Sequence, residues 1–445
     1  MKEKLRSLYF AWLLDPRFIE IRRSVSELFP KLMFRKRVVS VFLQLDDPYS
    51  YLLSHYLQYV IQRYQAVEFR FLICQGLRGE YMPEPALLAE HALQDCKLLA
   101  QEFGVPFLDK GDTPVVEYRL PLLEFLAAEQ NEDDFAETMT LALANYWRGD
   151  TEGAARLMGR TYGESAETSV LIGKNQLLLR KMGHYNCATM HYSGEWYWGV
   201  DRLHYLVERL EELGLNRFAE PVPELASLER AMQLNLPATV PARAEALPAL
   251  EMFHSFRSPY SYLALQNAFD IADSFGLKLQ TRPLLPGQGR RVSVPKTKLR
   301  YFLSDASREA RFRGVEFGKI ADFTELQAER LIAAYFYAKD QGRERDFLTE
   351  VGKAIFAEGI MASSDEGMQV VAERAGLFWP ELQEAMRSDK WRDEVKRNQE
   401  RLADTGLWGV PVFKLGEQIF WGQDRAWLVA RKIEDLCHGG EGIMI

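Results

Sequence analysis

Two regions of the chain begin with the same arrangement of apolar and polar positions. An apolar run at 38–43 leads, after Pro48, into an amphipathic stretch over 49–64, and a run at 250–253 leads, after Pro259, into a similar stretch over 260–275. Short apolar runs bounded by turn residues are typical of buried strands, and apolar positions three and four apart are typical of helices. Each region is therefore expected to open with a strand and a helix.

The rest of each region follows a common order. A second apolar run, at 67–72 and at 277–280, predicts a second strand, and a long, mainly helical stretch comes next. In the second region, 412–421 predicts a hairpin around Gly416-Glu417, and a last helix begins near Arg425. Strand, helix, strand, helices, hairpin and helix is the order of a thioredoxin-type α/β domain with an inserted helical subdomain.

Three motifs occur once in each region, in the same order. The sequence Asp-Pro-Tyr-Ser-Tyr-Leu at 47–52 returns as Ser-Pro-Tyr-Ser-Tyr-Leu at 258–263, Asp95…Gly104-Val105 returns as Asp305…Gly314-Val315, and Trp-Gly-Val-Asp-Arg at 198–202 returns as Trp-Gly-Gln-Asp-Arg at 421–425. We interpret the recurrence as a tandem duplication, because three matches at nearly constant spacing are unexpected by chance. The predicted parts are a helical arm at 1–36, a first domain at 37–232, a proline- and alanine-rich linker at 233–248 and a second domain at 249–437.

Composition limits the class of protein. The chain has 445 residues, 47% of them hydrophobic, and a net charge of −8, with a pI near 5.6. This length suits two or three folded domains, and the acidic balance argues against nucleic acid as the main partner. No apolar run approaches the roughly eighteen residues of a membrane-spanning helix, and the stretch 8–14 lacks the cleavage pattern of a secretory signal. We expect a cytoplasmic protein that does not bind membranes.

The cysteine spacing limits the chemistry. The four cysteines are Cys74, Cys96, Cys187 and Cys437, and no two of them are two or three residues apart. This spacing excludes a Cys-x-x-Cys redox centre, a zinc ribbon and a disulfide scaffold. The seven histidines form no metal-type pair with Cys or Glu, so we expect no metal site.

Ser258 stands at the predicted junction of a strand and a helix. Serine followed by proline is typical of a capped helix start, and that role alone explains an isolated Ser-Pro. A helix N-terminus also stabilises an anion, and the Ser258 hydroxyl can donate a hydrogen bond to a sulfur atom. A thiolate site at Ser258 is therefore one of two interpretations.

Pro411 directly precedes the first strand of the predicted hairpin. Proline cannot donate a hydrogen bond to a sheet, so it is confined to strand starts and edges. The Val410–Pro411 bond is a candidate cis peptide, whose geometry turns the Val410 N–H and C=O outward to pair with an extended peptide. An ordinary trans proline at a strand start is the alternative.

Taken together, the motifs resemble a known group. The sequence Ser-Pro-Tyr-Ser-Tyr-Leu, the Gly409-Val410-Pro411 motif and Phe-Trp-Gly-Gln-Asp-Arg at 420–425 closely resemble the 2-hydroxychromene-2-carboxylate isomerase and kappa-class glutathione transferase group, in the DsbA-like branch of the thioredoxin fold. The segment 295–315 fits the same group, and the resemblance covers 249–435. It implies an α/β protein with two tandem DsbA-type thioredoxin domains, each with an inserted helical subdomain.

The resemblance also implies glutathione as cofactor or co-substrate and no metal. Ser258 would be the catalytic residue that holds the glutathione sulfur as thiolate, with Val410 and Pro411 at the cysteinyl unit. Gln423 and Asp424 would bind the γ-glutamyl end, and Lys298 the glycyl carboxylate. The pocket would further include Arg257, Tyr260, Ser261, Tyr301, Trp408 and Trp421, whereas the contacts of 288–291 (Gln-Gly-Arg-Arg) are undefined. A DsbA-type cysteine pair would occupy positions 258 and 261, so the serines there decide against a disulfide oxidase.

The first region carries a degenerate version of this site. Asp47 stands for Ser258, Ala188 for Pro411 and Leu88 for Lys298, while Asp201 corresponds to the retained Asp424. A carboxylate repels a thiolate, so we favour a non-catalytic pseudodomain. The alternative is a changed chemistry, with Asp47 as general base near Cys187 or His184.

The predicted function is that of a glutathione-dependent isomerase or transferase. Its substrate would be a small aromatic or unsaturated electrophile. The alternatives are a non-catalytic scaffold of thioredoxin-like domains, or an enzyme of the same fold that uses another small thiol. The two repeats could form a pseudo-dimer within one chain, and the chain could also form a homodimer.

Overall fold

The structure is a computed structural model that describes residues 2–33, 35–76, 81, 84–107, 114, 116–159, 166–217, 220–285, 295–321 and 325–439. The chain divides into two compact units. The C-terminal unit comprises Met1–Ile21, Leu234–Val292 and Leu299–Ile445, and the N-terminal unit comprises Arg22–Gln233 and Ser293–Lys298. The division at Gln233 falls at the start of the predicted linker, whereas the predicted arm at 1–36 is shared between the units. The predicted Gln-Gly-Arg-Arg segment at 288–291 lies outside the described residues.

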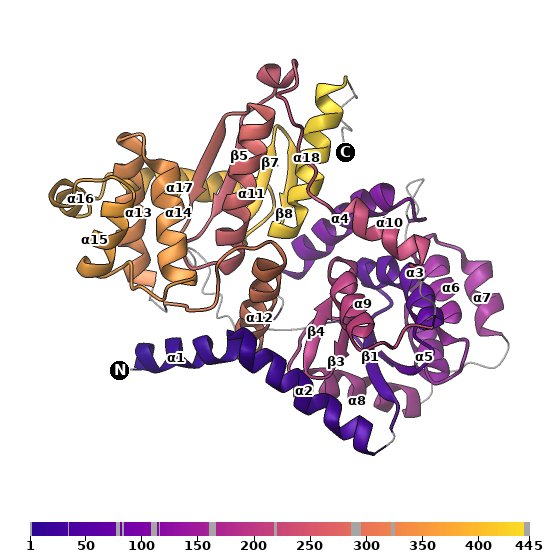
Figure 1. Ribbon diagram of the computed structural model, residues 1–445. Coiled ribbons are helices and arrows are strands. Elements are labelled where there is room, and N and C mark those ends of the chain that lie inside the picture. The colour runs from indigo at the N-terminus through magenta and orange to yellow at the C-terminus, as the bar shows by residue number, and fades with distance from the viewer. Residues whose placement is uncertain are drawn as a thin grey trace. The chain divides into compact units, whose positions relative to one another are not determined.

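The C-terminal unit is built around a sheet of four strands, in the order β6-β5-β7-β8 (Figure 1). Strand β5 (Leu250–His254) pairs in parallel with β6 (Leu279–Pro283) and antiparallel with β7 (Val412–Leu415), which forms a hairpin with β8 (Gln418–Trp421). All five residues of β5 are buried. The predicted strand at 277–280 begins later, at Leu279, because the Leu277 N–H closes the preceding helix by donating to Ala272 O at 2.9 Å.

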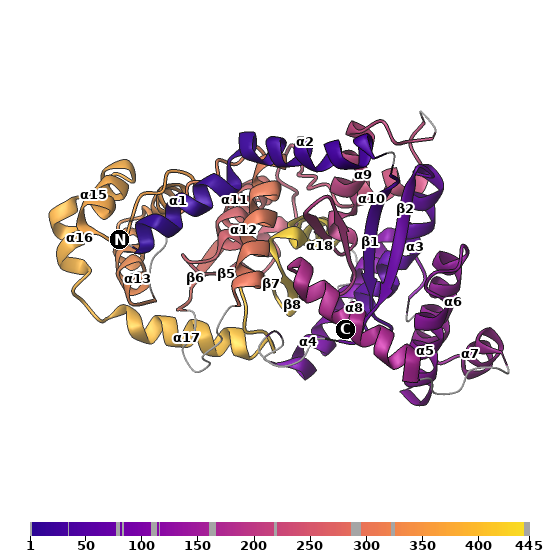
Figure 2. The same cartoon turned by 90° about the horizontal axis from the view of Figure 1, so that it is seen from below.

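Most helices of this unit follow β6 and precede β7 in the sequence. They are α1 (Lys2–Leu14), the 3-10 turn η4 (Ala244–Ala246), α11 (Pro259–Phe275), α12 (Lys296–Phe312), α13 (Glu325–Asp340), α14 (Glu344–Phe356), α15 (Asp365–Arg374), α16 (Trp379–Ala385), α17 (Trp391–Ala403), η5 (Gln423–Arg425) and α18 (Ala426–Cys437). The division assigns the first three residues of α12 to the other unit. Helices α13, α15 and α16 lie together in both views (Figure 1, Figure 2), while α11 packs on β5 and α14.

The N-terminal unit has a sheet of the same order, β2-β1-β3-β4. Its strands are β1 (Arg37–Leu43), β2 (Val67–Ile73), β3 (Thr189–Tyr192) and β4 (Glu195–Trp198), with β1 parallel to β2 and antiparallel to β3. Its helices are α2 (Pro16–Leu32, of which Arg22 onward belongs here), α3 (Pro48–Arg63), α4 (Pro85–Phe103), η2 (Val116–Tyr118), α5 (Arg119–Glu129), α6 (Phe135–Trp147), α7 (Thr151–Met158), α8 (Ala166–Met182), η3 (Val200–Arg202), α9 (Leu203–Glu212) and α10 (Pro223–Ala231). No helix in the described ranges is both long and apolar enough to cross a bilayer.

Matching hydrogen bonds hold the recurring motifs in the two units. The Tyr49 hydroxyl donates to Asp95 at 2.8 Å, as the Tyr260 hydroxyl does to Asp305 at 2.8 Å. The Gln44 N–H donates to Ser50 Oγ at 3.1 Å, and the Ser255 N–H to Ser261 Oγ at 3.2 Å. Within each unit, therefore, equivalent residues fix the start of the helix that follows the first strand.

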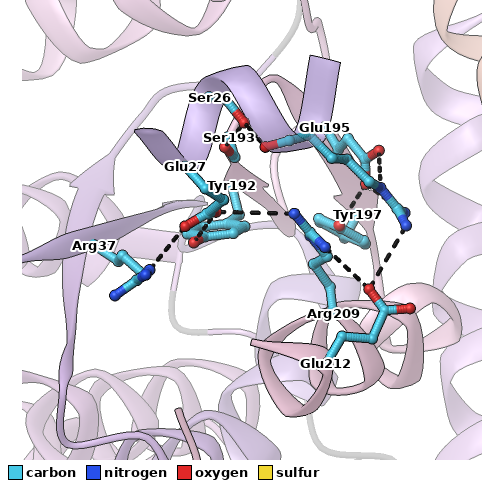
Figure 3. A network of polar contacts seen from close by, with 10 residues as sticks. Ser26, Glu27, Arg37, Tyr192, Ser193, Glu195, Tyr197, Arg209 and Glu212 are labelled. Carbon is cyan, nitrogen blue, oxygen red and sulfur yellow. Dashed lines mark hydrogen bonds and ion pairs between the residues drawn. The ribbon is translucent and has the colours of Figure 1, made fainter. Parts of the chain in front are cut away.

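A buried polar network ties α2 to the β3–β4 hairpin of the N-terminal unit (Figure 3). The Glu27 carboxylate accepts from Arg37 Nε at 2.8 Å and from the Tyr192 hydroxyl at 2.5 Å, and it lies 3.9 Å from Arg209 Nη2. Near it, Arg23 Nε donates to Glu195 at 2.9 Å. Because Glu27 is only 8% exposed, the three groups around it replace water as the partners of its charge.

Replacing Glu27 by alanine should destabilise the N-terminal unit. The change leaves Arg37 and Tyr192 without their buried acceptor, so we expect the free energy of unfolding to fall by about 2–3 kcal/mol. Glu212→Ala is the matched control, because this glutamate meets Arg209 at 3.0 Å but its side chain is 47% exposed; its loss should cost about 0.5 kcal/mol. Urea unfolding of both variants measures the difference, and equal losses would contradict the role given to Glu27.

Candidate active site

The register of the C-terminal sheet brings three segments to one edge. Phe253 of β5 pairs with Val412 of β7, which pairs in turn with Trp421 of β8. Because β5 and β7 are antiparallel, the end of β5, the start of β7 and the end of β8 lie at the same edge. The Gly422 N–H donates to Pro411 O at 3.0 Å and joins the last two segments. The predicted site residues Ser258, Val410, Pro411, Gln423 and Asp424 all belong to these segments or follow them directly.

Ser258 caps α11, as the sequence predicts. Its backbone is extended (φ −98°, ψ 116°), its oxygen accepts from the Ser261 N–H at 3.1 Å, and Pro259 fills the first helical position. The hydroxyl is half-buried. Since the capping bond uses the oxygen as acceptor, the hydroxyl hydrogen can be donated to a sulfur at the helix N-terminus.

Two other serines hold the turn that carries Ser258. The buried Ser261 accepts from the Ser255 N–H, while Ser255 Oγ accepts from the Arg257 N–H at 3.3 Å and Ser255 O from the Ser258 N–H at 3.0 Å. The Ser261 side chain therefore positions the turn, and the exposed Arg257 side chain lies at its surface.

The peptide bond between Val410 and Pro411 is cis. Within the described residues, the Val410 peptide group has no backbone hydrogen-bond partner. The Val410 side chain packs on the core cluster formed by Phe253, Leu284, Leu402, Leu407 and Val412. A rigid core thus holds a backbone edge of the kind that an extended peptide can pair with.

Gly409 allows the Trp421 ring to lie against the chain ahead of the cis bond. A Cβ at Gly409 would come within 2.5 Å of the Trp421 ring. Trp421 in turn makes an edge-on contact with Trp408, with ring centroids 5.1 Å apart. The two tryptophans predicted as pocket walls therefore contact each other beside Val410.

Gly422 and a hydrogen bond to helix α12 position the residues that follow β8. Gly422 has a φ of 120°, and a Cβ there would lie 2.4 Å from the Asp424 carboxylate, so this close approach needs glycine. Asp424 Oδ1 lies 3.6 Å from Arg425 Nη1. Gln423 is buried, with its Nε2 donating to Glu309 at 2.9 Å, while its Oε1 has no partner among the described residues.

Helix α12 carries the remaining predicted contacts. Tyr260 bonds to Asp305 on this helix, and Tyr301 is buried. Lys298, in contrast, is assigned to the N-terminal unit, where its Nζ lies 5.5 Å from the centre of the Tyr185 ring. Burial lowers the pKa of Lys298 from its ordinary value. No motif in the sequence predicts this cation–aromatic contact.

His254, which the sequence analysis did not single out, is the last residue of β5. It is fully buried beside a small cavity that Ser255, Phe256, Tyr262 and residues of α14 also line, and neither ring nitrogen has a partner among the described residues. Burial lowers the pKa of His254 to about 3, so the ring is neutral. The strand sequence Leu-Glu-Met-Phe-His does not indicate this cavity.

The N-terminal unit presents a different set at the equivalent edge. The Gly199 N–H donates to Ala188 O at 2.7 Å, the counterpart of the bond to Pro411, and Ala188 has a positive φ of 52°. Gly199 again lies against an aspartate, with a Cβ there 3.5 Å from Asp201 Oδ2. Leu88, on α4, which the sequence motifs match to Lys298, carries no charge.

Asp47 caps α3 in the place of Ser258. Its carboxylate accepts from the Ser50 hydroxyl at 2.8 Å and from the Tyr49 N–H at 3.3 Å. Burial raises the pKa of Asp47 to about 6, and the bond from Ser50 opposes the rise. The Asp47 carboxylate is therefore a weak base that titrates near neutral pH.

The described residues hold no cluster of three or more His, Cys, Asp or Glu that could bind a metal.

The C-terminal unit is similar to known proteins. Residues 249–434 match the family model described as a DSBA-like thioredoxin domain. The chain is 28% identical over 186 residues to a 2-hydroxychromene-2-carboxylate isomerase of Sphingobium xenophagum, covering 40% of this chain and 93% of the relative. It is 22% identical over 196 residues to the protein of that name from Pseudomonas putida, covering 42% of this chain and 95% of the relative.

Two solved structures are also similar to part of this chain. One is of a 2-hydroxychromene-2-carboxylate isomerase, with 22% identity and a TM-score of 0.38 over 43% of this chain and 97% of that chain. The other is of a probable DsbA oxidoreductase from Streptomyces coelicolor, with 18% identity and a TM-score of 0.37 over 44% of this chain and 92% of that one. The family match makes residues 249–434 similar to DsbA-like thioredoxin domains.

Asp47 should make the stability of the protein depend on pH. Its pKa is about 6 in the folded state and near 3.8 in an unfolded chain, so the folded state binds the proton more tightly. The ionised group therefore destabilises the fold, and this effect is absent below about pH 4 and complete above about pH 7. Asparagine keeps the helix cap without the charge.

Asp47→Asn should raise the free energy of unfolding by about 1–2 kcal/mol at pH 7.5 and change it little at pH 4. The expected gain is less than the full pKa shift implies, because the side chain is only half-buried. Asp150→Asn is the control, since the exposed Asp150 caps α7 by accepting from the Gly153 N–H at 2.7 Å. Urea unfolding at both values of pH measures the effect, and a gain that does not depend on pH would refute it.

Proposed function

We propose that the protein is a glutathione-dependent isomerase or transferase, of the 2-hydroxychromene-2-carboxylate isomerase type, that acts on aromatic or unsaturated electrophiles. The observation that carries the proposal is the position of the Ser258 hydroxyl. It stands at the N-terminus of α11, on the edge of the sheet that also holds the cis Val410–Pro411 peptide. The relatives named as isomerases, which align over nearly their full length, support it.

The Ser258 environment suits a thiolate. The N-terminus of α11 carries the positive end of the helix dipole, and the hydroxyl adds a hydrogen bond to the sulfur anion. Both interactions favour the ionised thiol, so glutathione bound here would be a nucleophile at neutral pH. In the fold's redox-active members cysteines would occupy positions 258 and 261; here the sulfur arrives with the ligand.

The neighbouring segments suit the rest of glutathione. The Val410 peptide group would form backbone hydrogen bonds with the cysteinyl unit, as the edge of a sheet does with an added strand. The Asp424 carboxylate and the unpartnered, buried Gln423 Oε1 are acceptors for the γ-glutamyl ammonium group. Binding of the glycyl carboxylate by Lys298 remains a prediction, and the proposal does not depend on it.

The proposed chemistry begins with addition of the thiolate to an unsaturated carbon conjugated to a carbonyl group. The electron pair of the carbon–carbon double bond moves to the carbonyl oxygen, so the former double bond can rotate. In an isomerase, return of that electron pair expels the thiolate and leaves an isomer and intact glutathione. In a transferase, protonation of the adduct releases a stable thioether. The walls formed by Trp408 and Trp421 would pack against an aromatic substrate.

In this proposal the N-terminal unit does not bind glutathione. Both units share one strand order and matching hydrogen bonds, which supports a tandem duplication of one domain with inserted helices. Asp47 stands where the thiolate would lie, and an ionised carboxylate there disfavours glutathione thiolate. We therefore propose one glutathione site per chain.

We also propose that the protein works in the cytoplasm, where glutathione is mostly reduced.

The test measures the pKa of glutathione bound to the full chain by its thiolate absorbance. In the wild type, the pKa of the bound thiol should fall below that of free glutathione, and Ser258→Ala should raise it by about one to two units. Turnover of 2-hydroxychromene-2-carboxylate at neutral pH should fall together with the thiolate fraction.

Ser364→Ala is the matched control, because Ser364 caps α15 by accepting from the Gly367 N–H at 3.1 Å. Both variants lose a helix cap, at a cost of about 1 kcal/mol, but only Ser258→Ala should change the thiol. Absence of glutathione binding to the wild type, or equal thiol pKa values in wild type and Ser258→Ala, would refute the proposal. A scaffold without turnover would give the first of these results.

A further inference from the structure

Helix α2 exposes a row of large apolar side chains. The row consists of Phe18, Ile21, Val25, Leu28 and Leu32, which range from 39% exposed at Phe18 to 68% exposed at Leu32. Their spacing alternates between three and four residues, so at about 100° per residue they cover an arc of about 80° on the helix. The five residues therefore form one apolar stripe along α2.

The opposite face of α2 packs on the β3–β4 hairpin through polar side chains. Arg23 Nε donates to Glu195 at 2.9 Å, and the Ser193 hydroxyl donates to Ser26 Oγ at 2.5 Å (Figure 3). Glu27 belongs to the same face and is buried. The centre of this face lies about 170° from the centre of the apolar stripe. A helix of a soluble domain normally buries its apolar face, so packing within the N-terminal unit does not explain the stripe.

Exposed aromatic rings lie next to the N-terminal end of the stripe. Tyr9 and Trp12 of α1 are 45% and 48% exposed. The Trp12 ring centroid lies 6.3 Å from that of Tyr9 and 5.7 Å from that of Phe18, the first residue of the stripe. Tyrosine and tryptophan combine an apolar ring with a polar group, which suits them to the boundary between water and lipid.

The segment that carries these residues is basic. Residues 1–36 contain nine Lys or Arg and four Asp or Glu, a net charge of +5, whereas the whole chain carries −8. Arg17 and Arg22 are exposed and stand on either side of the stripe. An apolar face bordered by basic residues complements a surface that is negative outside and apolar beneath, which is the chemistry of an anionic lipid bilayer.

A second copy of the chain fits the stripe less well. Alternating spacings of three and four are also those of a coiled-coil seam, in which residues beside one seam face residues beside the other. In a parallel pair of α2 helices, Arg17 of one copy would face Arg22 of the other. The like charge of the two basic segments also opposes their pairing. Charge therefore favours lipid over a second copy.

We propose that α2, together with the aromatic end of α1, binds the surface of an anionic membrane. The apolar stripe and the Tyr9 and Trp12 rings enter the boundary between head groups and acyl chains, and the basic residues lie at the lipid phosphates. The expectation of no membrane contact rested on the lack of a spanning run, which does not bear on a helix that lies on the surface. The proposal is independent of the glutathione site, because none of its residues belongs to the Ser258 edge.

The experiment mixes the full chain with vesicles of phosphatidylcholine and phosphatidylglycerol in equal parts, and separately with vesicles of phosphatidylcholine alone. Flotation measures the fraction of protein bound at each lipid concentration. We expect the affinity for the mixed vesicles to be higher by about tenfold or more, because the anionic lipid attracts the basic residues. Added sodium chloride should weaken this binding, since salt screens the attraction.

Variants test the stripe itself. Val25→Gln combined with Leu28→Gln should lower the affinity for the mixed vesicles by about tenfold or more, because two side chains that enter the lipid become polar. Both positions face away from the hairpin contacts, so urea unfolding should change little. Leu141→Gln combined with Leu177→Gln is the matched control, since these leucines of α6 and α8 are also exposed in the N-terminal unit. The control should keep the wild-type affinity.

Three results would overturn the proposal. The first is wild-type protein that does not float with the mixed vesicles or that binds both kinds of vesicle equally. The second is a stripe variant that folds and binds as the wild type does. The third is a lipid-free dimer, detected by sedimentation velocity, that the stripe variant dissociates and that does not bind vesicles. The wild-type comparison of the two kinds of vesicle decides the outcome even if the variant folds poorly.

Discussion

The antiparallel register of the central strand with the first hairpin strand determines where chemistry can occur in each unit. Phe253 opposite Val412, and Phe42 opposite Thr189, bring the end of the central strand next to the residue that precedes the hairpin. A glycine N–H after the hairpin then bonds to that residue's carbonyl group, Pro411 in one unit and Ala188 in the other. A helix also begins at this edge. The position of each site therefore depends on the sheet and not on the long helical segments.

The two edges share a backbone and differ in the groups they present. The C-terminal unit offers a hydroxyl at Ser258 and a Val410 peptide group that has no backbone partner among the described residues, which would suit a thiolate brought by a peptide-like ligand. The N-terminal unit has a carboxylate at Asp47. A negative charge repels an incoming thiolate. The two edges therefore differ in the charge that they present to an incoming ligand.

Local patterns in the sequence were enough to predict much of the fold. The cap at Ser258, the proline ahead of β7 and the hairpin at 412–421 depend on neighbouring residues, and the structure confirms the helix start, the cis bond and both hairpin strands. The contacts that the sequence could not show join residues far apart in the chain. The contact of Lys298 with Tyr185 depends on tertiary packing, which residue spacing does not encode.

A crystal structure of the full chain with glutathione would show whether the Ser258 edge binds glutathione by its sulfur. We expect the glutathione sulfur within hydrogen-bond distance of Ser258 Oγ and the cysteinyl backbone paired with the Val410 peptide group. Glutathione bound elsewhere, or bound at this edge with its sulfur pointing away from Ser258, would refute the proposed role of Ser258.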